Sequence, residues 1–351
     1  MSSADSRPLE SSSAAGSTSG APTLAATAKQ RVRDLIGVTK QFAREHRGWS
    51  WFHLWSTLGV MSCAFLATAL PFPWLVRAGF SVVAALLLVR MFIIYHDHSH
   101  RTILRGSRLA KVIMYVFGIL TLNPPSAWKS SHDYHHKHNA KNFGVNIGSF
   151  PLLTTHGYAR ASRWERFSYA LSRHPLTIAC AYLTVFLYSM SLKPLIVERA
   201  SRRDCGIAVA LHLGIITLLA VLAPYVLLFT FMVPMWIASA LGAYLFYSQH
   251  NFPGVQLRDR PAWDFVFAAL YSSSYTAMSP VMHWFTGNIG YHHVHHLNAH
   301  IPFYRLPEAM GAIRELQTPS TIRLTLSDIR RCFRLKLWDP EKGMMVSFDG
   351  T

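Results

Sequence analysis

The chain has 351 residues and a formal net charge of +17, yet only 15% of its residues are charged and 51% are hydrophobic. This hydrophobic content excludes a disordered chain. A nucleic-acid-binding protein could carry such a charge. However, the stretch from Cys205 to Leu257 has no charged residue and is mostly apolar, and a soluble domain of this size does not need such a stretch. Of the 19 histidines, seven lie between residues 96 and 138 and five between residues 292 and 300, which points to metal chemistry at a membrane.

The four cysteines are widely spread and show no CxxC spacing, so we expect them to be reduced and structural. They are Cys63, Cys180, Cys205 and Cys332. The metal site therefore offers imidazole without thiolate. This donor set disfavours a structural zinc finger and favours catalytic iron, copper or zinc.

The N-terminal segment changes character at about residue 29. Residues 1–28 are rich in Ser and Ala and predict a disordered tail. A transit peptide is disfavoured because Asp5 and Glu10 are present and basic residues are few. Residues 29–52 predict a basic interfacial helix that leads into a group of tryptophans.

Four apolar segments are long enough to cross a bilayer, whose core of about 30 Å needs roughly 20 helical residues. They are residues 53–71, 74–95, 206–223 and 226–247. Pro71 and Pro73 mark the turn between the first two, and Pro224 marks the turn between the last two. The sequence therefore predicts two transmembrane hairpins.

Two further apolar segments, 109–122 and 176–192, decide on which side the histidines lie. The segment 193–205 is basic and should lie on the same side as the basic N-terminal segment. This holds if both apolar segments dip into the membrane without crossing it. We therefore expect an all-α integral membrane protein with four spans, two half-embedded segments and a histidine-rich cap. Both termini and the cap should be cytoplasmic.

The histidines occur at spacings that place imidazoles on one helix face. His96 and His100 stand at i and i+4 where the second span ends, and two groups repeat the spacing i, i+3, i+4. His250 follows the fourth span. The nine candidate ligands are His96, His100, His132, His135, His136, His250, His292, His295 and His296. Nine imidazoles exceed the needs of one ion and suit two, and imidazole suits iron, copper, zinc and nickel alike.

The alternative for any single histidine is an ordinary surface or packed side chain, and it is favoured for the histidines that stand alone. These are His46, His53, His156, His174 and His212.

The boxes HDHSH, HDYHH and HHVHH, with QHNF and the run from Trp284 to Leu306, resemble membrane fatty acid desaturases. The likeness is greatest to bacterial acyl-lipid desaturases of the omega-6 (delta-12) type. It extends from about residue 50 to the end of the chain, so a desaturase domain is expected over 53–351.

The resemblance implies a diiron centre that uses O2 and two electrons to introduce a double bond into a long acyl chain. Matched box by box, it implies the same nine histidines as iron ligands. The chain shows neither a His-Pro-Gly-Gly haem motif nor a GxGxxG flavin fingerprint, so a separate electron donor, ferredoxin-like or similar, is implied. Membrane lipid acyl chains are the expected partner, and the acyl group could be carried on phospholipid, CoA or a carrier protein. Nucleic acid is not an expected partner, and the bacterial inner membrane is the expected location.

The chain departs from the family pattern at a few positions. His98 and Ser99 replace the usual middle of the first box, His300 is added after the third, and Phe246 stands where some relatives carry an asparagine that binds metal through water. These changes bear on substrate and product. Outer-shell partners for the imidazoles are expected among Asp97, Asp133, Asp259, Asp264, Asn288 and Asn298.

Two other functions compete with desaturation. A diiron hydroxylase of an alkyl chain, carotenoid or sphingolipid could use the same scaffold. A metal transporter would carry ionisable residues inside its spans. Between Cys205 and His250 the only such residue is His212, which disfavours transport.

Overall fold

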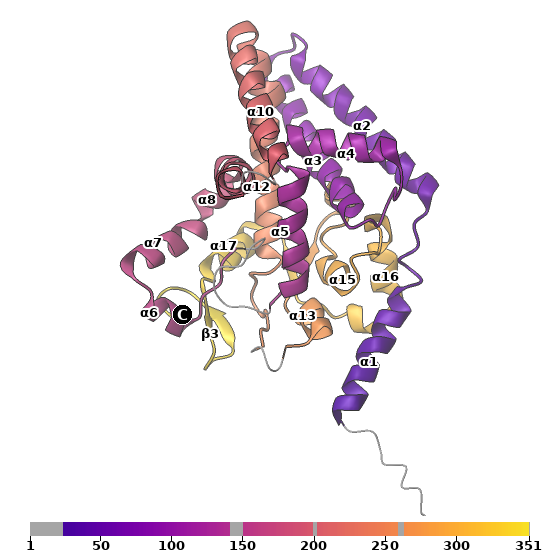
Figure 1. The fold of residues 1–351 in the computed structure, drawn as a ribbon, viewed down its shortest axis with the longest axis vertical. Coiled ribbons are helices and arrows are strands. Elements are labelled where there is room, and N and C mark those ends of the chain that lie inside the picture. Colours follow the sequence, from indigo (N-terminus) through magenta and orange to yellow (C-terminus); the bar gives the residue numbers. More distant parts are fainter. Residues whose placement is uncertain (1–23, 141–149, 199–201, 259–262, 351) are drawn as a thin grey trace, which may run out of the picture.

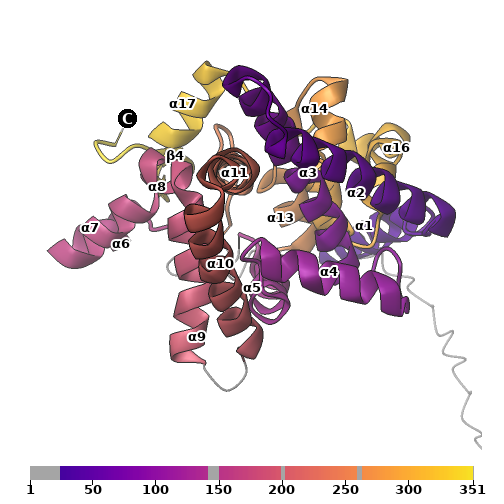
Figure 2. The same ribbon diagram turned by 90° about the horizontal axis from the view of Figure 1, so that it is seen from above.

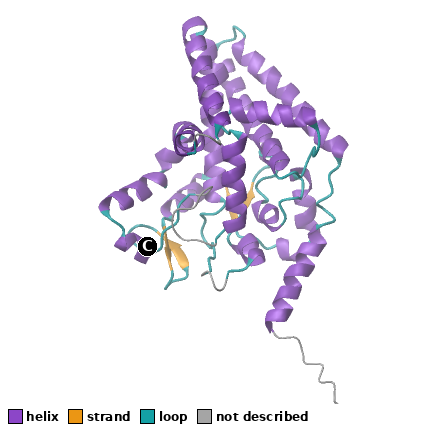
Figure 3. Ribbon diagram, viewed as in Figure 1, coloured by secondary structure: helices purple, strands orange, loops and turns teal. Residues whose placement is uncertain are grey.

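The computed structural model describes residues 24–140, 150–198, 202–258 and 263–350. Most of this part is helical, and strands are few (Figures 1 and 3). The N-terminal half contains α1 (Leu24–Thr39), α2 (Arg47–Ala69), α3 (Trp74–Ser99), α4 (Arg108–Leu120), α5 (Pro125–His138), α6 (Thr155–Arg160) and α7 (Arg163–Ser172). The middle contains α8 (Pro175–Ala179), η1 (Tyr182–Leu192), α9 (Lys193–Val197), α10 (Arg203–Leu222), α11 (Pro224–Val226), η3 (Leu227–Met232) and α12 (Val233–Ser248).

The C-terminal part consists of short elements. The helices are α13 (Phe265–Tyr271), α14 (Pro280–Phe285), α15 (His292–Leu297), η5 (Phe303–Arg305), α16 (Leu306–Ala312), η6 (Arg314–Leu316) and α17 (Leu326–Arg334). The strands are β1 (Tyr275–Ala277), β2 (Thr321–Arg323), β3 (Leu337–Asp339) and β4 (Met344–Val346). β1 and β2 pair in parallel with Thr276 opposite Ile322, and β3 and β4 pair antiparallel with Trp338 opposite Met345. These two small sheets are the only departure from an all-α fold in the described residues.

Four helices of the described part are long and apolar enough to cross a membrane, which confirms the predicted spans. They are Arg47–Ala69, Trp74–Ser99, Arg203–Leu222 and Pro224–Ser248. The hairpin turns fall at the predicted prolines, because α2 ends just before Pro71 and a new helix begins at Pro224. The main difference is at the C-terminal end of the second span, where the helix continues past residue 95 to Ser99.

The second span is the central helix of the membrane part. It is 61% buried in its most apolar window, whereas the other three spans are 17–22% buried. It packs between α2 and α12. The outer spans expose large apolar side chains such as Leu66 and Val221, as lipid-facing helices do. The first histidine box is therefore carried on the most deeply buried span.

The two segments predicted to dip into the membrane are helices that do not run along the spans. α4 has 13 residues, about 20 Å of helix, which is too short to cross the bilayer core. The other forms the apolar helix Tyr182–Val197. Figure 1 shows this helix end-on beside an upright α12, and Figure 2, in which α11 is seen end-on, shows it lengthways. It lies across the second hairpin.

The predicted division at residue 28 falls close to the start of the described part. Most of the predicted tail, 1–28, lies outside the described residues, and α1 begins at Leu24. α1 does not continue into the first span, because a connection from Lys40 to His46 separates the two helices. The predicted interfacial segment 29–52 thus covers most of α1, this connection and the first residues of α2.

Candidate metal centre

The first histidine box is placed by the continuation of α3 beyond the membrane segment. His96 lies in the last turn of α3, and His100 is its C-terminal cap residue. The i, i+4 spacing puts both imidazoles on one side of this turn, as the sequence predicts. They meet imidazoles of the second and third boxes, which lie on α5 and α15, and His250 follows α12.

All nine predicted ligands come together, in two groups. The five-histidine group contains His96, His100, His132, His136 and His295, and the four-histidine group contains His135, His250, His292 and His296. The ligand nitrogens within each group all lie within 4.8 Å of one another. No other group of three or more His, Cys, Asp or Glu side chains placed to bind a metal was found in the described ranges.

The second and third boxes each contribute to both groups, a division that the sequence did not predict. On a helix, i+4 lies about 40° from i on one side and i+3 about 60° on the other. In the second box the i, i+4 pair His132 and His136 joins the five-histidine group, while His135 joins the other. In the third box the assignment is reversed, so α5 and α15 each bridge the two groups.

The Nε2 atoms of the four-histidine group form a closed ring. Nε2 of His250 lies 2.9 Å from that of His292 and 3.1 Å from that of His135. Nε2 of His296 lies 3.0 Å from that of His292 and 3.2 Å from that of His135. Two nitrogens that bind one ion at right angles, each at about 2.1 Å, are separated by about 3.0 Å. The ring matches this spacing on all four sides.

The five-histidine group has the same spacing along a chain of contacts. Nε2 of His132 lies 2.9 Å from that of His100 and 3.1 Å from that of His136. Nε2 of His136 is in turn 3.1 Å from that of His295. The ring of His96 lies 4.6 Å, between centroids, from the rings of His132 and His295.

Hydrogen bonding alone does not account for these contacts. A neutral imidazole nitrogen offers one in-plane site, either a proton or a lone pair, so it forms one good N–H···N bond at most. Each Nε2 of the ring has two neighbours. Moreover, Nδ1 of His250 lies 3.1 Å from the carbonyl oxygen of Ser272, an acceptor that requires the proton on Nδ1 and leaves Nε2 with its lone pair. Inward lone pairs are what a cation requires.

The environment keeps these imidazoles neutral. Burial, reinforced by the neighbouring imidazoles, holds the pKa of His132, His135 and His136 well below the usual range. Burial lowers the pKa of His250 to about 4, against a smaller opposing effect of its bond to Ser272. Metal ligation needs deprotonated imidazole, so the donor set and its ionisation both fit a bound metal.

Of the predicted outer-shell partners that the structure describes, only Asp97 contacts a ligand imidazole. Asp97 Oδ1 lies 3.0 Å from Nδ1 of His96, and its Oδ2 accepts the N–H of Phe303 at 2.7 Å. The other described candidates have partners other than a ligand imidazole. Asp133 pairs with Lys129, Asp264 caps α13 at Phe267, Asn288 donates to the carbonyl of Phe303, and Asn298 donates to Thr39. Asp259 lies outside the described residues.

Two outer-shell contacts were not predicted from the sequence. One is the Ser272 carbonyl at His250, a backbone group that carries no residue-type signal. The other is Asn139, whose buried side-chain amide lies 3.4 Å from Nδ1 of His296. Asn139 follows His136 by three residues, so a search around the box for amides as well as carboxylates would have included it.

The remaining histidines stand outside both groups. Nδ1 of His98 faces the carbonyl of Ile103 at 3.2 Å, and His300 is exposed. His293 is buried but bonds the carbonyl of Leu316. The histidines expected to be ordinary, His46, His53, His156, His174 and His212, also lie outside the groups.

Comparison with known proteins agrees with this geometry. A family model described as fatty acid desaturase matches residues 72–325. A protein of Bacillus subtilis (strain 168) named "Fatty acid desaturase" is 32% identical over 298 residues, which cover 83% of this chain and 82% of the relative. This chain belongs to the fatty acid desaturase family. An Anabaena variabilis protein named "sn-1 oleoyl-lipid 12-desaturase" is 21% identical over 299 residues, covering 81% of this chain and 82% of that protein.

Membership fixes the broad chemistry of this desaturase-family chain. It is an oxidoreductase and an integral membrane protein, and its substrates are lipid acyl chains. The two histidine groups lie where the second and fourth spans end. Phe246 fills space beside the four-histidine group, with its ring 4.9 Å from that of His135.

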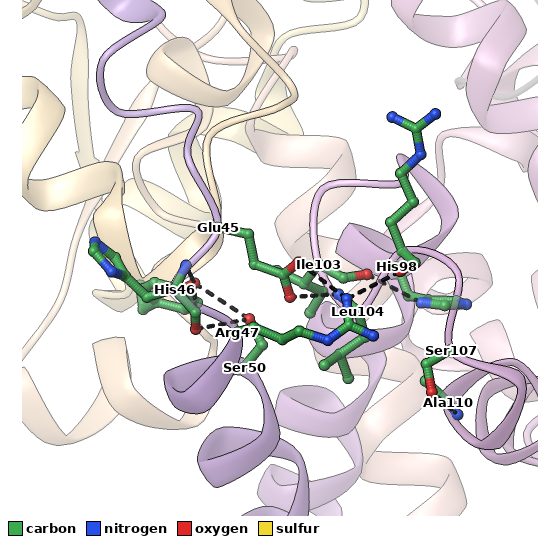
Figure 4. A network of polar contacts seen from close by, with 11 residues as sticks. Glu45, His46, Arg47, Ser50, His98, Ile103, Leu104, Ser107 and Ala110 are labelled. Carbon is green, nitrogen blue, oxygen red and sulfur yellow. Dashed lines mark hydrogen bonds and ion pairs between the residues drawn. The ribbon is translucent and has the colours of Figure 1, made fainter.

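The loop after the first box of the desaturase is held by the connection between α1 and α2 (Figure 4). Arg101 and Leu104 have φ of 59° and 52°, a left-handed conformation that non-glycine residues rarely adopt. Glu45 Oε1 accepts the N–H of Leu104 at 2.5 Å, and Arg47 donates to the carbonyl of Arg105 at 3.0 Å. The N-terminal segment thereby fixes the turn that follows His100.

A buried arginine in a span ties the desaturase's third box to the membrane helices. Arg90 of α3 is 2% exposed and has no carboxylate partner in the described residues. It donates to Thr57 at 3.0 Å and to the carbonyl of Trp284, and it lies 3.1 Å from Nδ1 of His53. Its guanidinium also stacks 4.1 Å from the Trp284 ring. Arg90 therefore joins α2 and α3 to α14, which precedes the third box.

Proposed function

We propose that this protein is a membrane-bound desaturase that holds two iron ions and introduces a double bond into a long acyl chain of a membrane lipid. The reaction consumes the saturated –CH2–CH2– unit, one O2, two electrons and two protons. It yields –CH=CH– and two waters. The observation that carries the proposal is the closed ring of four imidazole nitrogens beside a second group of five, in a chain of the desaturase family.

The nine histidines would hold the two ions, one in each group. Iron is proposed rather than zinc or copper because of the family, since imidazole donors alone suit all three. When bound, the ions supply the activation of O2 that removal of hydrogen from an unactivated chain requires. The fit rests on the neutral, inward-facing imidazoles and on nitrogen separations of 2.9–3.2 Å.

The protein's own residues contribute orientation and exclusion of water. Six of the nine imidazoles belong to buried residues. Asp97 would fix the tautomer of His96, and the Ser272 carbonyl that of His250, so that both present Nε2 lone pairs. Asp97 also connects the first box to Phe303, beyond the third box, which keeps the two boxes in register.

An acyl group on a membrane lipid is proposed over acyl-CoA. The Anabaena relative is named for an oleoyl-lipid substrate and for position 12. In addition, the histidine groups lie at the ends of apolar spans, where the chain of a resident lipid could reach them. The double-bond position in this protein's own product is left to the experiment below.

The histidine side is proposed to face the cytoplasm of a bacterial inner membrane. The chain around both hairpin turns, residues 66–76 and 218–228, carries no charged side chain. The opposite ends of the spans adjoin basic residues such as Arg47 and Arg203. Electrons would come from a separate protein donor, and residues 53–351 would form the catalytic unit.

The test is expression in a bacterium whose lipids lack polyunsaturated chains, followed by mass spectrometry of total membrane acyl chains. New double bonds should appear with the native chain and disappear with His292→Ala. His156→Ala serves as a matched control, because this exposed histidine lies outside both groups. Hydroxylated chains without new unsaturation would instead support the hydroxylase alternative, and near-normal turnover by His292→Ala would exclude the proposed site.

A further inference from the structure

Helix α7 carries an apolar stripe that no described residue covers. Trp164, Phe167 and Leu171 stand at i, i+3 and i+7, so they share one face of the helix. They are 73%, 57% and 53% exposed, and the rings of Trp164 and Phe167 lie 5.7 Å apart. Such a contiguous exposed aromatic surface marks an interaction site.

The opposite face of α7 holds the helix to the protein. Tyr169 is buried among Leu337 and Val346 of the C-terminal strands, and its hydroxyl donates to the carbonyl of Lys336. Arg173, the residue after the helix, donates to Asn251, the neighbour of His250. The stripe is therefore the outward face of a firmly attached helix.

The stripe continues into the surface that faces lipid. Leu176, at the start of the next helix, is 67% exposed, and the apolar helix Tyr182–Val197 that follows exposes Leu183 and Tyr188. Figures 1 and 2 both show α7 extending outward from α8, at the side of the second hairpin. The exposed apolar side chains therefore continue along the chain from α7 to the helix Tyr182–Val197, and one membrane interface could cover both.

Charges around α7 match a membrane surface. Arg160 and Arg163 are exposed just before the stripe, whereas Glu165 is the only acidic residue of α7. Glu165 completes a capping box with Ser162. Basic residues beside aromatic and leucine side chains are typical of helices that lie in the interface of anionic membranes.

We propose that α7 is a membrane-interface anchor. Trp164, Phe167 and Leu171 insert among the lipid chains of the leaflet on the histidine side, and Arg160 and Arg163 bind the lipid phosphates. The anchor connects the lipid surface, through Arg173 and Asn251, to the segment that follows His250.

The experiment uses the full chain, in vesicles of phosphatidylcholine and phosphatidylglycerol, with a fluorophore on a single introduced cysteine. Cys63 and Cys180, which are not buried, are first replaced by alanine. Phe167→Cys reports the stripe, and Leu171→Cys repeats the measurement should Phe167→Cys misfold. Glu165→Cys is the control, because it lies about 160° around the helix from position 167.

Labels at 167 and 171 should be quenched severalfold more by nitroxide-bearing lipid than by aqueous iodide, and the label at 165 should show the reverse. Replacing Arg160 and Arg163 by glutamine should weaken the lipid quenching at 167. Iodide quenching at 167 and 171 equal to that at 165 would overturn the proposal. Protection from both quenchers would also overturn it, because a second copy or another protein would then cover the stripe.

Discussion

Nε2 of His135 and Nε2 of His250 lie 3.1 Å apart, although 115 residues separate these two histidines in the sequence. His135 comes from α5, and His250 follows the fourth span. Neither nitrogen has a carbonyl or carboxylate partner in the described residues, and each has a second imidazole nitrogen near it. The four-histidine group therefore depends on correct packing between helices that are far apart in the sequence.

Asp97 should control metal affinity through His96. In Asp97→Asn the amide oxygen can still accept the N–H of Phe303, but the carboxylate beside Nδ1 of His96 is lost. Loss of such an outer-shell partner typically weakens metal binding about 10–100-fold. Iron retention against a chelator measures this effect. Asp133→Asn is the matched control, since Asp133 also lies within a histidine box but pairs with Lys129, and equal iron loss in both variants would contradict the role of Asp97.

Gly290→Ala should destabilise the segment that precedes the third box. A Cβ at Gly290 would lie 2.5 Å from the carbonyl oxygen of Thr276, a backbone atom that cannot move aside alone. Overpacking of this kind costs about 1–3 kcal/mol. The thermal midpoint in detergent should fall. Gly311→Ala provides the comparison, because a Cβ added at Gly311, in helix α16, would meet no atom within 4 Å; it should leave the midpoint equal or higher.

Arg90→Gln should loosen the packing of α14 on the spans. The variant leaves the Trp284 carbonyl and the Thr57 hydroxyl without their charged donor. Breaking a buried charged network costs roughly 2–4 kcal/mol. Hydrogen exchange should rise in residues 280–291 more than in α10, which Arg90 does not contact. Arg330→Gln, at an exposed arginine of α17, controls for loss of charge, and unchanged exchange in residues 280–291 of Arg90→Gln would contradict this role.

The metal-free protein should lose stability in mild acid. The unfolded chain binds protons on histidine below pH 6.5, while burial lowers the pKa of His132, His135 and His136 and brings that of His250 to about 4. The unfolded state therefore binds more protons in this window, and stability falls as pH drops from 6.5 towards 4. Thermal midpoints of chelator-treated protein should decrease across it. A midpoint that rises over the same interval would show that these imidazoles are not buried as neutral groups.

The sequence predicted what depends on composition and local spacing. The four spans follow from apolar length, eight of the nine histidines from i, i+3 and i+4 spacing, and His250 from its place just after the fourth span. Their division into groups of five and four could not be predicted, because it depends on which imidazoles from other helices meet each side of α5 and α15. Outer-shell partners were predicted poorly for the same reason. Asp133 forms an ion pair with Lys129, whereas Asn139, 157 residues away in the sequence, contacts the imidazole of His296.

The most direct test of the diiron site is the metal content of the purified protein, measured by inductively coupled plasma mass spectrometry. We expect two iron ions per chain in the native protein, retained in His300→Ala and lost in His292→Ala and His132→Ala, which remove one ligand from each group. A native protein that holds no iron, or variants that keep both ions, would contradict the claim that these nine histidines form a diiron site.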